Sequence, residues 1–143
     1  MRIAVKKLRE NAVIPRYATA GAAAMDLYVS QAPNTVFPGE TVYVHTGLAM
    51  AIPKGYVGLI FARSGLASTH GLAPANKVGV IDSDYRGEIV VALHNHGDSS
   101  KNIAVGDRIA QMMIVACEHV GLDEVDELSG TERGTGGFGS TGK

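Results

Sequence analysis

The chain of 143 residues is long enough for one domain with a hydrophobic core and too short for two ordinary domains. Apolar residues make up 45% of the sequence, as in a globular protein. The formal net charge is −1, from 13 basic and 14 acidic residues, which argues against a polymeric nucleic-acid partner, because such proteins need a basic surface for the phosphate backbone. A small anionic ligand needs only a local cluster of donors and is compatible with this charge.

Two features bear on the cellular compartment. The single cysteine, Cys117, lies in the apolar run 112–117 and has no partner for an intrachain disulfide, so a buried, inert thiol in a reducing compartment is expected. The first ten residues are charged and lack the apolar core of a signal peptide, and no apolar run approaches the length of a membrane span. We therefore expect a cytoplasmic protein.

Short apolar or alternating segments follow one another along most of the chain. Only the stretch 64–70 is compatible with a helical turn, with Ser64 as its N-cap and Gly71 at its end. Many short strands at this spacing are typical of an all-β sandwich or barrel, and we expect the jelly-roll type. The expected strand segments are 2–8, 25–29, 41–52, 56–62, 77–81, 88–93, 102–105 and 108–119. Turn residues separate them at 38–39, 53–55, 95–98 and 106–107.

The stretch 78–88 joins two apolar segments through a polar tip. Strand, polar tip and strand is the pattern of a β-hairpin. Asp, Ser and Gly are ordinary turn residues, so one interpretation is a solvated hairpin without a chemical role. The tip nevertheless carries Asp82 and Asp84 in D-x-D spacing, followed by Tyr85 and Arg86, which is more charge than a turn requires. The other interpretation is a functional site at this tip.

The end of the chain differs in composition from the rest. An acidic linker begins at residue 121, and residues 130–143 then hold six glycines. Such a segment cannot bury enough surface to fold alone, so a disordered terminus is one interpretation. Its residue types also suit a nucleotide, because glycine N–H groups and a neighbouring arginine bind phosphate oxygens, and a lone aromatic ring stacks on a base. The second interpretation is therefore a lid that orders over a nucleotide, using Arg133, Phe138, Ser140 and Thr141.

Three polar positions occur within or directly after apolar segments. Arg63 and Ser64 follow the segment 56–61 and place guanidinium and hydroxyl donors at a strand end, although a plain helix cap has the same pattern. Gln111 lies in an otherwise apolar run, so it either satisfies a neighbouring backbone group or points into a site. Asp26 is expected to form an orienting ion pair, for instance with an arginine, rather than to take part in chemistry.

Five short motifs span the chain in order. They are Ala-Met-Asp-Leu at 24–27, Arg-Ser-Gly-Leu-Ala at 63–67, Gly-Val-Ile-Asp-Ser-Asp-Tyr-Arg-Gly at 79–87, Gly-Asp-Arg-Ile-Ala-Gln-Met at 106–112 and Arg-Gly-Thr-Gly-Gly-Phe-Gly-Ser-Thr-Gly at 133–142. Together they resemble the five ordered motifs of the trimeric dUTPases (deoxyuridine triphosphate nucleotidohydrolases), from about residue 17 to residue 142. Two residues depart from the family pattern: Ala24 stands where a glycine is usual, and Ala62 where a proline is usual. Neither change removes a chemical group.

The resemblance implies a jelly-roll-like β subunit in a three-fold homotrimer. Its three active sites would lie at subunit interfaces, and exchange of the C-terminal arm would let the tail of one subunit close over a site formed by others. A closed ring is a physically reasonable way to build such shared sites. Residues 1–120 are then expected to form the catalytic β-barrel, and residues 121–143 the linker and the flexible, glycine-rich lid of the same domain.

The implied reaction is the hydrolysis of dUTP to dUMP and pyrophosphate, which lowers dUTP and supplies dUMP for thymidylate synthesis. Asp82 matches the family position that holds the attacking water at the α-phosphorus. The implied cofactor is Mg²⁺, bound through the substrate phosphates without a direct protein ligand. Ser64 and Gln111 are assigned to the α- and β-phosphates, and Arg63 to support of the loop. The γ end is assigned to Arg133, Ser140 and Thr141.

Substrate choice is assigned to the stretch around 76–84, whose backbone would pair with the uracil edge. Asn76 matches the base-contacting side chain of the family, Tyr85 would lie under the deoxyribose, and Phe138 would stack on the uracil. The full set of expected substrate-binding residues is Arg63, Ser64, Gly65, Asn76, Val80, Asp84, Tyr85, Gln111, Arg133, Phe138, Gly139, Ser140 and Thr141, with Asp82 as the catalytic residue and Asp26 as the orienting one.

Two alternatives remain at this point. The first is a dCTP deaminase, or a bifunctional dCTP deaminase and dUTPase, of the same superfamily. Deamination needs a general acid/base carboxylate at the base edge, and no such residue stands beside the Arg63-Ser64 motif. The second is a catalytically silent β trimer that binds nucleotides.

Overall fold

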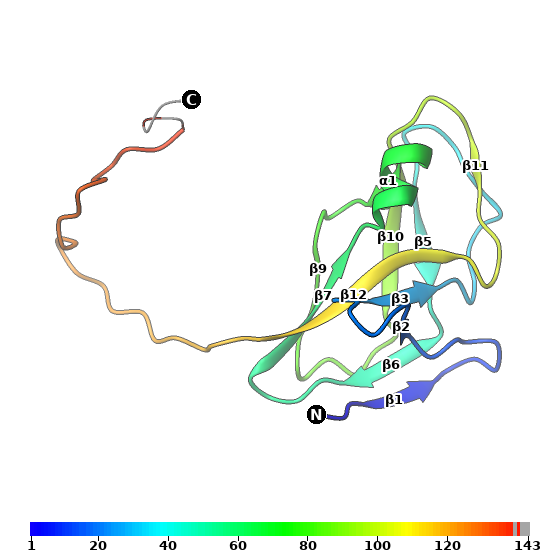
Figure 1. Ribbon diagram of the computed structural model, residues 1–143, viewed down its shortest axis with the longest axis horizontal. Coiled ribbons are helices and arrows are strands. Elements are labelled where there is room, and N and C mark those ends of the chain that lie inside the picture. Colours follow the sequence, from blue (N-terminus) through cyan, green and yellow to red (C-terminus); the bar gives the residue numbers. More distant parts are fainter. Residues whose placement is uncertain (139, 141–143) are drawn as a thin grey trace.

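The structure is a computed structural model that describes residues 1–138 and residue 140. Within this part of the chain it consists of short strands and one short helix, which confirms the all-β, jelly-roll-like fold class (Figure 1). In chain order the elements are β1 (Ala4–Lys7), β2 (Arg16–Tyr17), β3 (Met25–Tyr28), β4 (Thr35–Val36), β5 (Thr41–His45), β6 (Leu48–Ala51), β7 (Tyr56–Phe61), α1 (Ser64–His70), β8 (Leu72–Pro74), β9 (Gly79–Ile81), β10 (Val90–Asn95), β11 (Lys101–Asn102) and β12 (Arg108–Ala116).

The strands pair into antiparallel sheets that share one hydrophobic core. The largest sheet has the strand order β2-β3-β12-β7-β9 and a second has the order β5-β10-β8, while β1 pairs with β6 and β11 with β4. Since successive side chains of a strand point to opposite faces, every second residue is available to the core. In β10 the buried positions alternate in this way. The largest buried side chains include Leu27, Val44, Leu48, Ile52, Leu72, Ile89, Leu93, Ile109 and Met112.

The stretch expected to form a hairpin instead crosses from one sheet to the other. β9 pairs with β7, whereas β10 pairs with β5 and β8, so the prediction that these two segments pair with each other was wrong. Glycines favour the observed pairing of β9 with β7. A Cβ on Gly79 would lie 3.1 Å from the Cβ of Ile60, and one on Gly58 would lie 3.3 Å from the Cβ of Ile81. The loop 82–89 therefore connects two sheets.

A glycine also divides the segment 41–52, which we expected to be continuous. The break between β5 and β6 lies at Thr46 and Gly47, where Gly47 has a φ of +69°. A Cβ at this position would approach the Cβ of Ala12 and the Oγ of Ser30 to 2.8 Å each. A glycine is thus required both by the backbone conformation and by the close approach of the N-terminal segment.

Two local predictions were wrong. The helix α1 has the predicted bounds and ends at Gly71 with a φ of 69°, but its N-cap is Arg63 rather than Ser64, and no side chain of the described residues caps its first turn. Cys117 is exposed rather than buried, because β12 ends at Ala116 and the chain there leaves the body of the protein.

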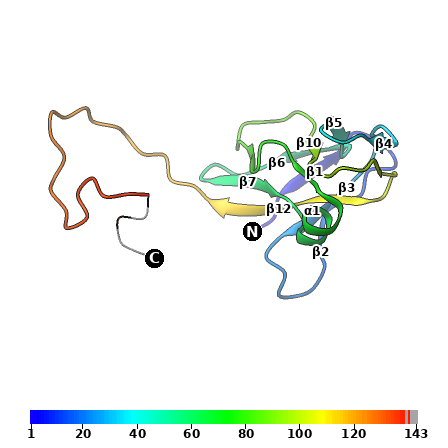
Figure 2. The same cartoon turned by 90° about the horizontal axis from the view of Figure 1, so that it is seen from above.

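After β12 the described chain contains no further strand or helix. The main-chain N–H of Cys117 still donates to the carbonyl of Gly55 at 2.8 Å, whereas the hydrogen bonds recorded beyond residue 130 join tail residues to one another. Both views show this tail running away from the sheets (Figures 1 and 2). A domain boundary near residue 120 remains a prediction. No helix in the described ranges has the length and apolar character needed to cross a membrane.

The carboxylate of Glu88 joins three distant parts of the chain. It accepts hydrogen bonds from the Nη1 of Arg9, from the Nδ1 of His45 at 2.9 Å and from the main-chain N–H of Gly47 at 2.8 Å. The Glu88 side chain is only 18% exposed. Burial raises the pKa of Glu88, but the hydrogen bonds from His45, Gly47 and Arg9 outweigh that effect and hold its pKa below the ordinary value.

This junction predicts a specific loss of stability in acid. A carboxylate whose pKa is depressed in the folded state stabilises fully above its unfolded pKa of about 4.3, and that contribution is lost as the pH falls through the folded pKa. We expect Glu88→Gln to cost about 1–3 kcal/mol at neutral pH and to flatten the dependence of the unfolding temperature on pH below about 5. Thermal unfolding followed by circular dichroism from pH 3 to 7 measures this, with the exposed Glu10→Gln as the control. Parallel curves for Glu88→Gln and the wild type would contradict the assignment.

Candidate functional site

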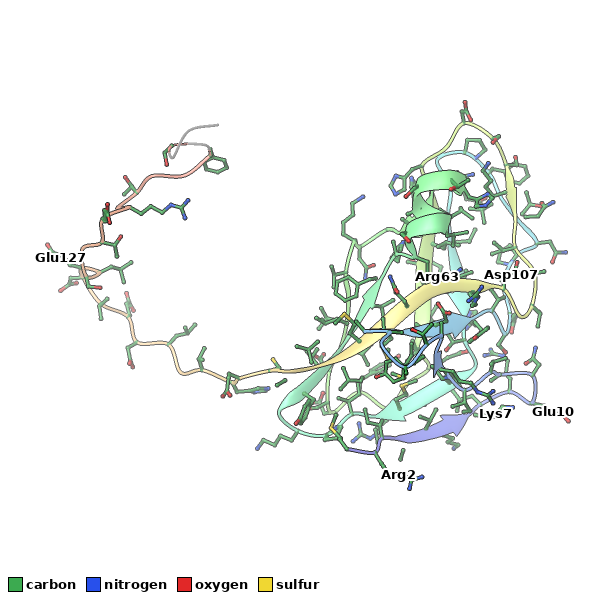
Figure 3. All side chains as sticks on the ribbon, in the orientation of Figure 1. Arg2, Lys7, Glu10, Arg63, Asp107 and Glu127 are labelled. Atoms are coloured by element: carbon green, nitrogen blue, oxygen red, sulfur yellow. The ribbon has the colours of Figure 1, made fainter. Side chains whose placement is uncertain are left out.

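One cleft, which we call the Arg63 cleft, lies where β7 leads into α1. It has a volume of about 640 Å³. Arg63 projects beside β12 at the base of α1 (Figure 3). The polar residues that line the cleft come from β3, β12 and the start of α1; they are Asp26, Arg63, Ser64, Arg108 and Gln111.

An ion-pair triad organises the Arg63 cleft. The Oδ1 of Asp26 lies 2.9 Å from the Nε of Arg63, and its Oδ2 lies 3.1 Å from the Nη1 of Arg108. The expected ion pair of Asp26 with an arginine is thus confirmed. Arg63 also donates from its Nη1 to the carbonyl of Arg108 at 3.0 Å, which fixes its guanidinium against β12. Two guanidinium groups share one carboxylate, so the triad keeps one net positive charge beside the cleft and suits an anion.

The other polar residues of this cleft border its open space. Gln111 donates from its Nε2 to the carbonyl of Ala62 at 2.8 Å, so it satisfies a backbone group and lines the cleft as well. Ser64 and Gly65 belong to the first turn of α1, and a Cβ on Gly65 would meet no atom within 4 Å. Main-chain N–H groups at such a helix start attract negative charge.

A second cleft, which we call the Asp82 cleft, lies at the opposite end of β7. Its volume is about 820 Å³. Its walls come from β9 and the loop after it, from the residues between 51 and 57 that end β6 and begin β7, and from the chain just after β12. Asp82 and Asp84 are both exposed, and neither forms an ion pair with any of the described residues. The lining residues include Tyr56, Val57, Val80, Asp82, Ser83, Asp84, Arg86, Cys117 and His119.

The loop that carries these carboxylates is held by its own hydrogen bonds. The main-chain N–H of Tyr85 donates to the carbonyl of Asp82 at 3.2 Å, and the Tyr85 hydroxyl donates to the carbonyl of Glu88 at 2.9 Å. Arg86 donates from Nη1 to the carbonyls of Ser83 and Tyr85 at 2.7 and 2.8 Å. A side chain on Gly87 would overlap the Tyr85 ring, so the glycine permits the ring to lie against the backbone.

Next to this loop, β9 is an edge strand. It pairs with β7 alone, so its outer edge presents backbone N–H and C=O groups that no neighbouring strand of the described chain uses. Val80 in this strand is 59% exposed. Asn76 is exposed just before the strand and is followed by Lys77, which has a φ of 65°.

A single chain does not bring the predicted site residues together. The two clefts lie at the two ends of the six-residue strand β7, which at about 3.4 Å per residue separates them by roughly 17 Å. None of the tail residues Arg133, Phe138 and Ser140 lines either cleft, and the tail segment that carries them runs away from the sheets (Figure 1). Gly139 and Thr141 lie outside the described residues. The predicted residues therefore form three separate groups.

Sequence reasoning missed Arg108. It belongs to the motif at 106–112, but the sequence did not predict it as a site residue. In the structure Arg108 lines the Arg63 cleft and shares the carboxylate of Asp26 with Arg63. The register of β12 on β3 places Arg108 opposite Tyr28 and Gln111 opposite Asp26, which brings both residues to the same corner. Only the strand pairing reveals this, because the sequence separation of 82 residues gives no signal.

Comparison with known proteins agrees with these observations. The family model described as dUTPase matches residues 10–142. A deoxyuridine 5'-triphosphate nucleotidohydrolase of Hydrogenobaculum sp. (strain Y04AAS1) is 49% identical and covers 99% of both chains, and one of Nautilia profundicola is 49% identical over 100% of both. Among solved structures, the Staphylococcus bacteriophage 80alpha dUTPase with dUpNHpp has a TM-score of 0.93 and 30% identity, and covers 99% of each chain. The chain belongs to the dUTPase family.

Proposed function

We propose that this protein hydrolyses dUTP to dUMP and pyrophosphate. The observation that carries the proposal is the match over 99% of both chains to a dUTPase structure that holds dUpNHpp, a dUTP analogue. Relatives at 44–50% identity are named deoxyuridine 5'-triphosphate nucleotidohydrolase and support the same activity. The proposal includes a cytoplasmic location, as expected from the sequence.

Asp82 is the catalytic residue in this proposal. Its exposed carboxylate accepts a proton from a water molecule whose oxygen attacks the α-phosphorus. The bond between the α-phosphorus and the oxygen that bridges to the β-phosphorus then breaks, and pyrophosphate leaves. Proton transfer to a positioned carboxylate contributes about 10²–10⁴-fold, so charge neutralisation at the phosphates must supply the rest of the acceleration.

The Arg63 cleft is the proposed site of the α- and β-phosphates. Ser64, the main-chain N–H groups around Gly65, and Gln111 offer donors there, and the Asp26 triad supplies positive charge. These donors suit phosphate oxygens rather than a metal ion, and within residues 1–138 and 140 no three His, Cys, Asp or Glu side chains are grouped to hold a metal. Magnesium is therefore proposed to be held by the triphosphate itself. When bound there it would neutralise phosphate charge.

The assembly in this proposal is a homotrimer with active sites at subunit interfaces. The separation of roughly 17 Å between the two clefts along β7 supports it, because one α-phosphorus cannot lie both in the Arg63 cleft and beside Asp82 of the same chain at that distance. A neighbouring subunit that brings its Asp82 cleft to the Arg63 cleft would complete the site. A third contribution, from Arg133, Phe138, Gly139, Ser140 and Thr141 of an exchanged tail, would close it over the base and the γ-phosphate.

An apolar groove beside β1 is proposed to bind the linker, from residue 120 to residue 128, of a neighbouring subunit. It has a volume of about 340 Å³ and is lined by Ile3, Val5, Tyr17, Met50 and Ile114, among others. Arg2 and Lys7 lie near the two ends of β1 on the body, whereas Glu127 lies on the distant tail (Figure 3). The linker alternates acidic residues with apolar side chains that are exposed in the single chain. The apolar ones are Val120, Leu122, Val125 and Leu128, and the acidic ones are Asp123, Glu124, Asp126 and Glu127.

The free edge of β9 is proposed to bind the base. Its backbone groups around Val80, with the Asn76 side chain beside them, would pair with the uracil edge as another strand would. Cytosine reverses the donor and acceptor there and leaves buried groups unpaired, a penalty that reaches about 10⁴–10⁵ in discrimination. Tyr85, held against Gly87, would lie under the deoxyribose where a 2′-hydroxyl would collide.

A pyrophosphate-release assay across dUTP, dTTP, dCTP and UTP tests the activity. We expect dUTP to be hydrolysed with a kcat/KM at least about 10³-fold above that of dCTP, whose base mispairs, and about 10–200-fold above those of dTTP and UTP, whose extra methyl and 2′-hydroxyl groups would collide with the site. The dCTP reaction is also assayed for ammonia. Ammonia release would establish a deaminase or a bifunctional enzyme. Binding of dUTP without release of pyrophosphate would establish a silent nucleotide-binding trimer.

A further inference from the structure

We infer that Glu88 is a positioning residue for hydrolysis, acting through the loop that carries Asp82 and Tyr85. This inference rests on the proposed role of that loop in dUTP hydrolysis. Glu88 does not line the Asp82 cleft, and its carboxylate is hydrogen-bonded to Arg9, His45 and Gly47 rather than to the loop. Its contribution is to hold the second end of the loop against the body of the protein.

The two ends of the loop are held by different means. At the first end, β9 is paired with β7 through backbone hydrogen bonds, and Asp82 follows directly. At the second end, the main-chain N–H of Ile89 donates to the carbonyl of Leu48 at 2.8 Å, which fixes the position of the chain. The Thr46 hydroxyl also donates to the carbonyl of Ile89. The Glu88 carboxylate adds to this by accepting from three donors of two other segments, which fix the direction of its side chain.

Glu88 connects those donors to the functional loop through its two polar groups. Its carboxylate faces Arg9, His45 and Gly47, and its carbonyl accepts the Tyr85 hydroxyl at 2.9 Å. Tyr85 in turn closes a turn on the carbonyl of Asp82. A continuous series of contacts therefore runs from the N-terminal segment to Asp82.

The segments that meet at Glu88 are themselves well fixed. The main-chain N–H of Leu8 donates to the carbonyl of Gly47 at 2.7 Å, which ties the N-terminal segment to the break between β5 and β6. Gly47 has no room for a side chain. Thr46 donates through its hydroxyl to the carbonyl of Ile89 at 2.7 Å. The carboxylate is thus anchored to a rigid corner, and movement of Glu88 would pass to the loop rather than be absorbed by its partners.

Glu88→Gln tests the inference because it keeps the size of the side chain. With the amide oxygen in the place of Oε1, it still accepts from Arg9 and Gly47, but the NH₂ group then takes the place of Oε2, and the Nδ1–H of His45 loses its acceptor. We expect kcat for dUTP to fall about 10-fold and KM to rise by a smaller factor. Of the proposed binding groups only Asp84 and Tyr85 lie on the loop, whereas the β9 edge and the Arg63 cleft do not depend on Glu88. Amide exchange with deuterium in the peptide covering 82–87 should be faster in the variant. All assays use the full-length protein at a temperature well below its unfolding.

Asn11→Ala is the matched control for a purely structural effect. It removes two hydrogen bonds to Ser30, of 2.9 and 2.8 Å, from the same N-terminal segment without touching Glu88. We expect it to lower the unfolding temperature and to leave both kcat and exchange at 82–87 unchanged. If Glu88→Gln lowers only the unfolding temperature, as the control does, the inference is overturned.

Two further outcomes are distinguished. If Glu88→Gln does not fold, Arg9→Gln takes its place, since it removes one of the three donors and should lower kcat in the same direction by a smaller factor. An Arg9→Gln variant with wild-type kcat and exchange would then refute the role of Glu88.

If the wild-type protein itself releases no pyrophosphate from dUTP, the proposed function fails, and the exchange data alone decide whether Glu88 orders the loop.

Discussion

Asp82→Asn is expected to bind dUTP and to lose about 10²–10⁴-fold in kcat. Asparagine has nearly the shape of aspartate but cannot accept the proton of the attacking water. The Asp82 side chain is exposed and forms no ion pair in the described chain, so the substitution should leave the unfolding temperature unchanged. Steady-state pyrophosphate release gives kcat, and calorimetric titration with dUpNHpp gives the affinity.

Asp98→Asn is the control for this experiment, because Asp98 is an exposed aspartate outside both clefts. Asp84→Asn distinguishes the two carboxylates of the D-x-D sequence, and we expect it to raise KM more than it lowers kcat. Wild-type turnover in Asp82→Asn would show that another group holds the water. A variant that neither turns over nor binds dUpNHpp would place Asp82 in binding rather than in chemistry.

Removal of residues 130–143 is expected to reduce kcat/KM by more than about 10²-fold while the body remains folded. The segment contains Arg133, whose charge-assisted hydrogen bonds to a phosphate are worth about 1.5–3 kcal/mol, or roughly 10–100-fold, and Phe138, whose stacking on a base is worth about 1–3 kcal/mol. The body should be unaffected, because in the described part of this segment, residues 130–138 and 140, the hydrogen bonds join residues of the segment to one another. Pyrophosphate release and thermal unfolding measure the two effects.

Point variants separate the contributions within the tail. Arg133→Ala should reproduce a large part of the loss, whereas Glu132→Ala, an exposed neighbour, should not. Full activity in the shortened protein would mean that the tail is not a lid. A large fall in the unfolding temperature would mean instead that residues 130–143 stabilise the assembly.

Local structure could be predicted from the sequence where a residue type determines the backbone. Gly39, Gly55, Gly71 and Gly106 all have positive φ values at the predicted turns and at the predicted end of the helix. The pairing of strands could not be predicted in this way, because it depends on residues far apart in the chain. The partner of β9 is an example: Gly58 and Gly79 fit β9 to β7, and neither glycine reads as a pairing signal in its own segment.

One contact of the candidate site, the ion pair of Asp26, could be predicted from the sequence, but the arrangement of the site residues in space could not. The ion pair of Asp26 followed from the cost of burying a lone carboxylate between apolar neighbours, and the structure contains it. Arg108 was missed because its contact with Asp26 depends on the register of β12 on β3. The prediction for Cys117 failed for a related reason: the apolar pattern of 112–117 does not reveal that the sheet ends one residue earlier.

The bare edge of β9 has a consequence for solubility. Backbone groups that can pair with a pyrimidine can equally well pair with another polypeptide, and exposed strand edges are common starting points for aggregation. Here the edge extends over only three residues, with Lys77 shortly before it and the carboxylate of Asp82 directly after it. A flat base can be accommodated by so short an edge, whereas an intruding strand would meet charge at both ends. The brevity of β9 therefore favours a small ligand over self-association.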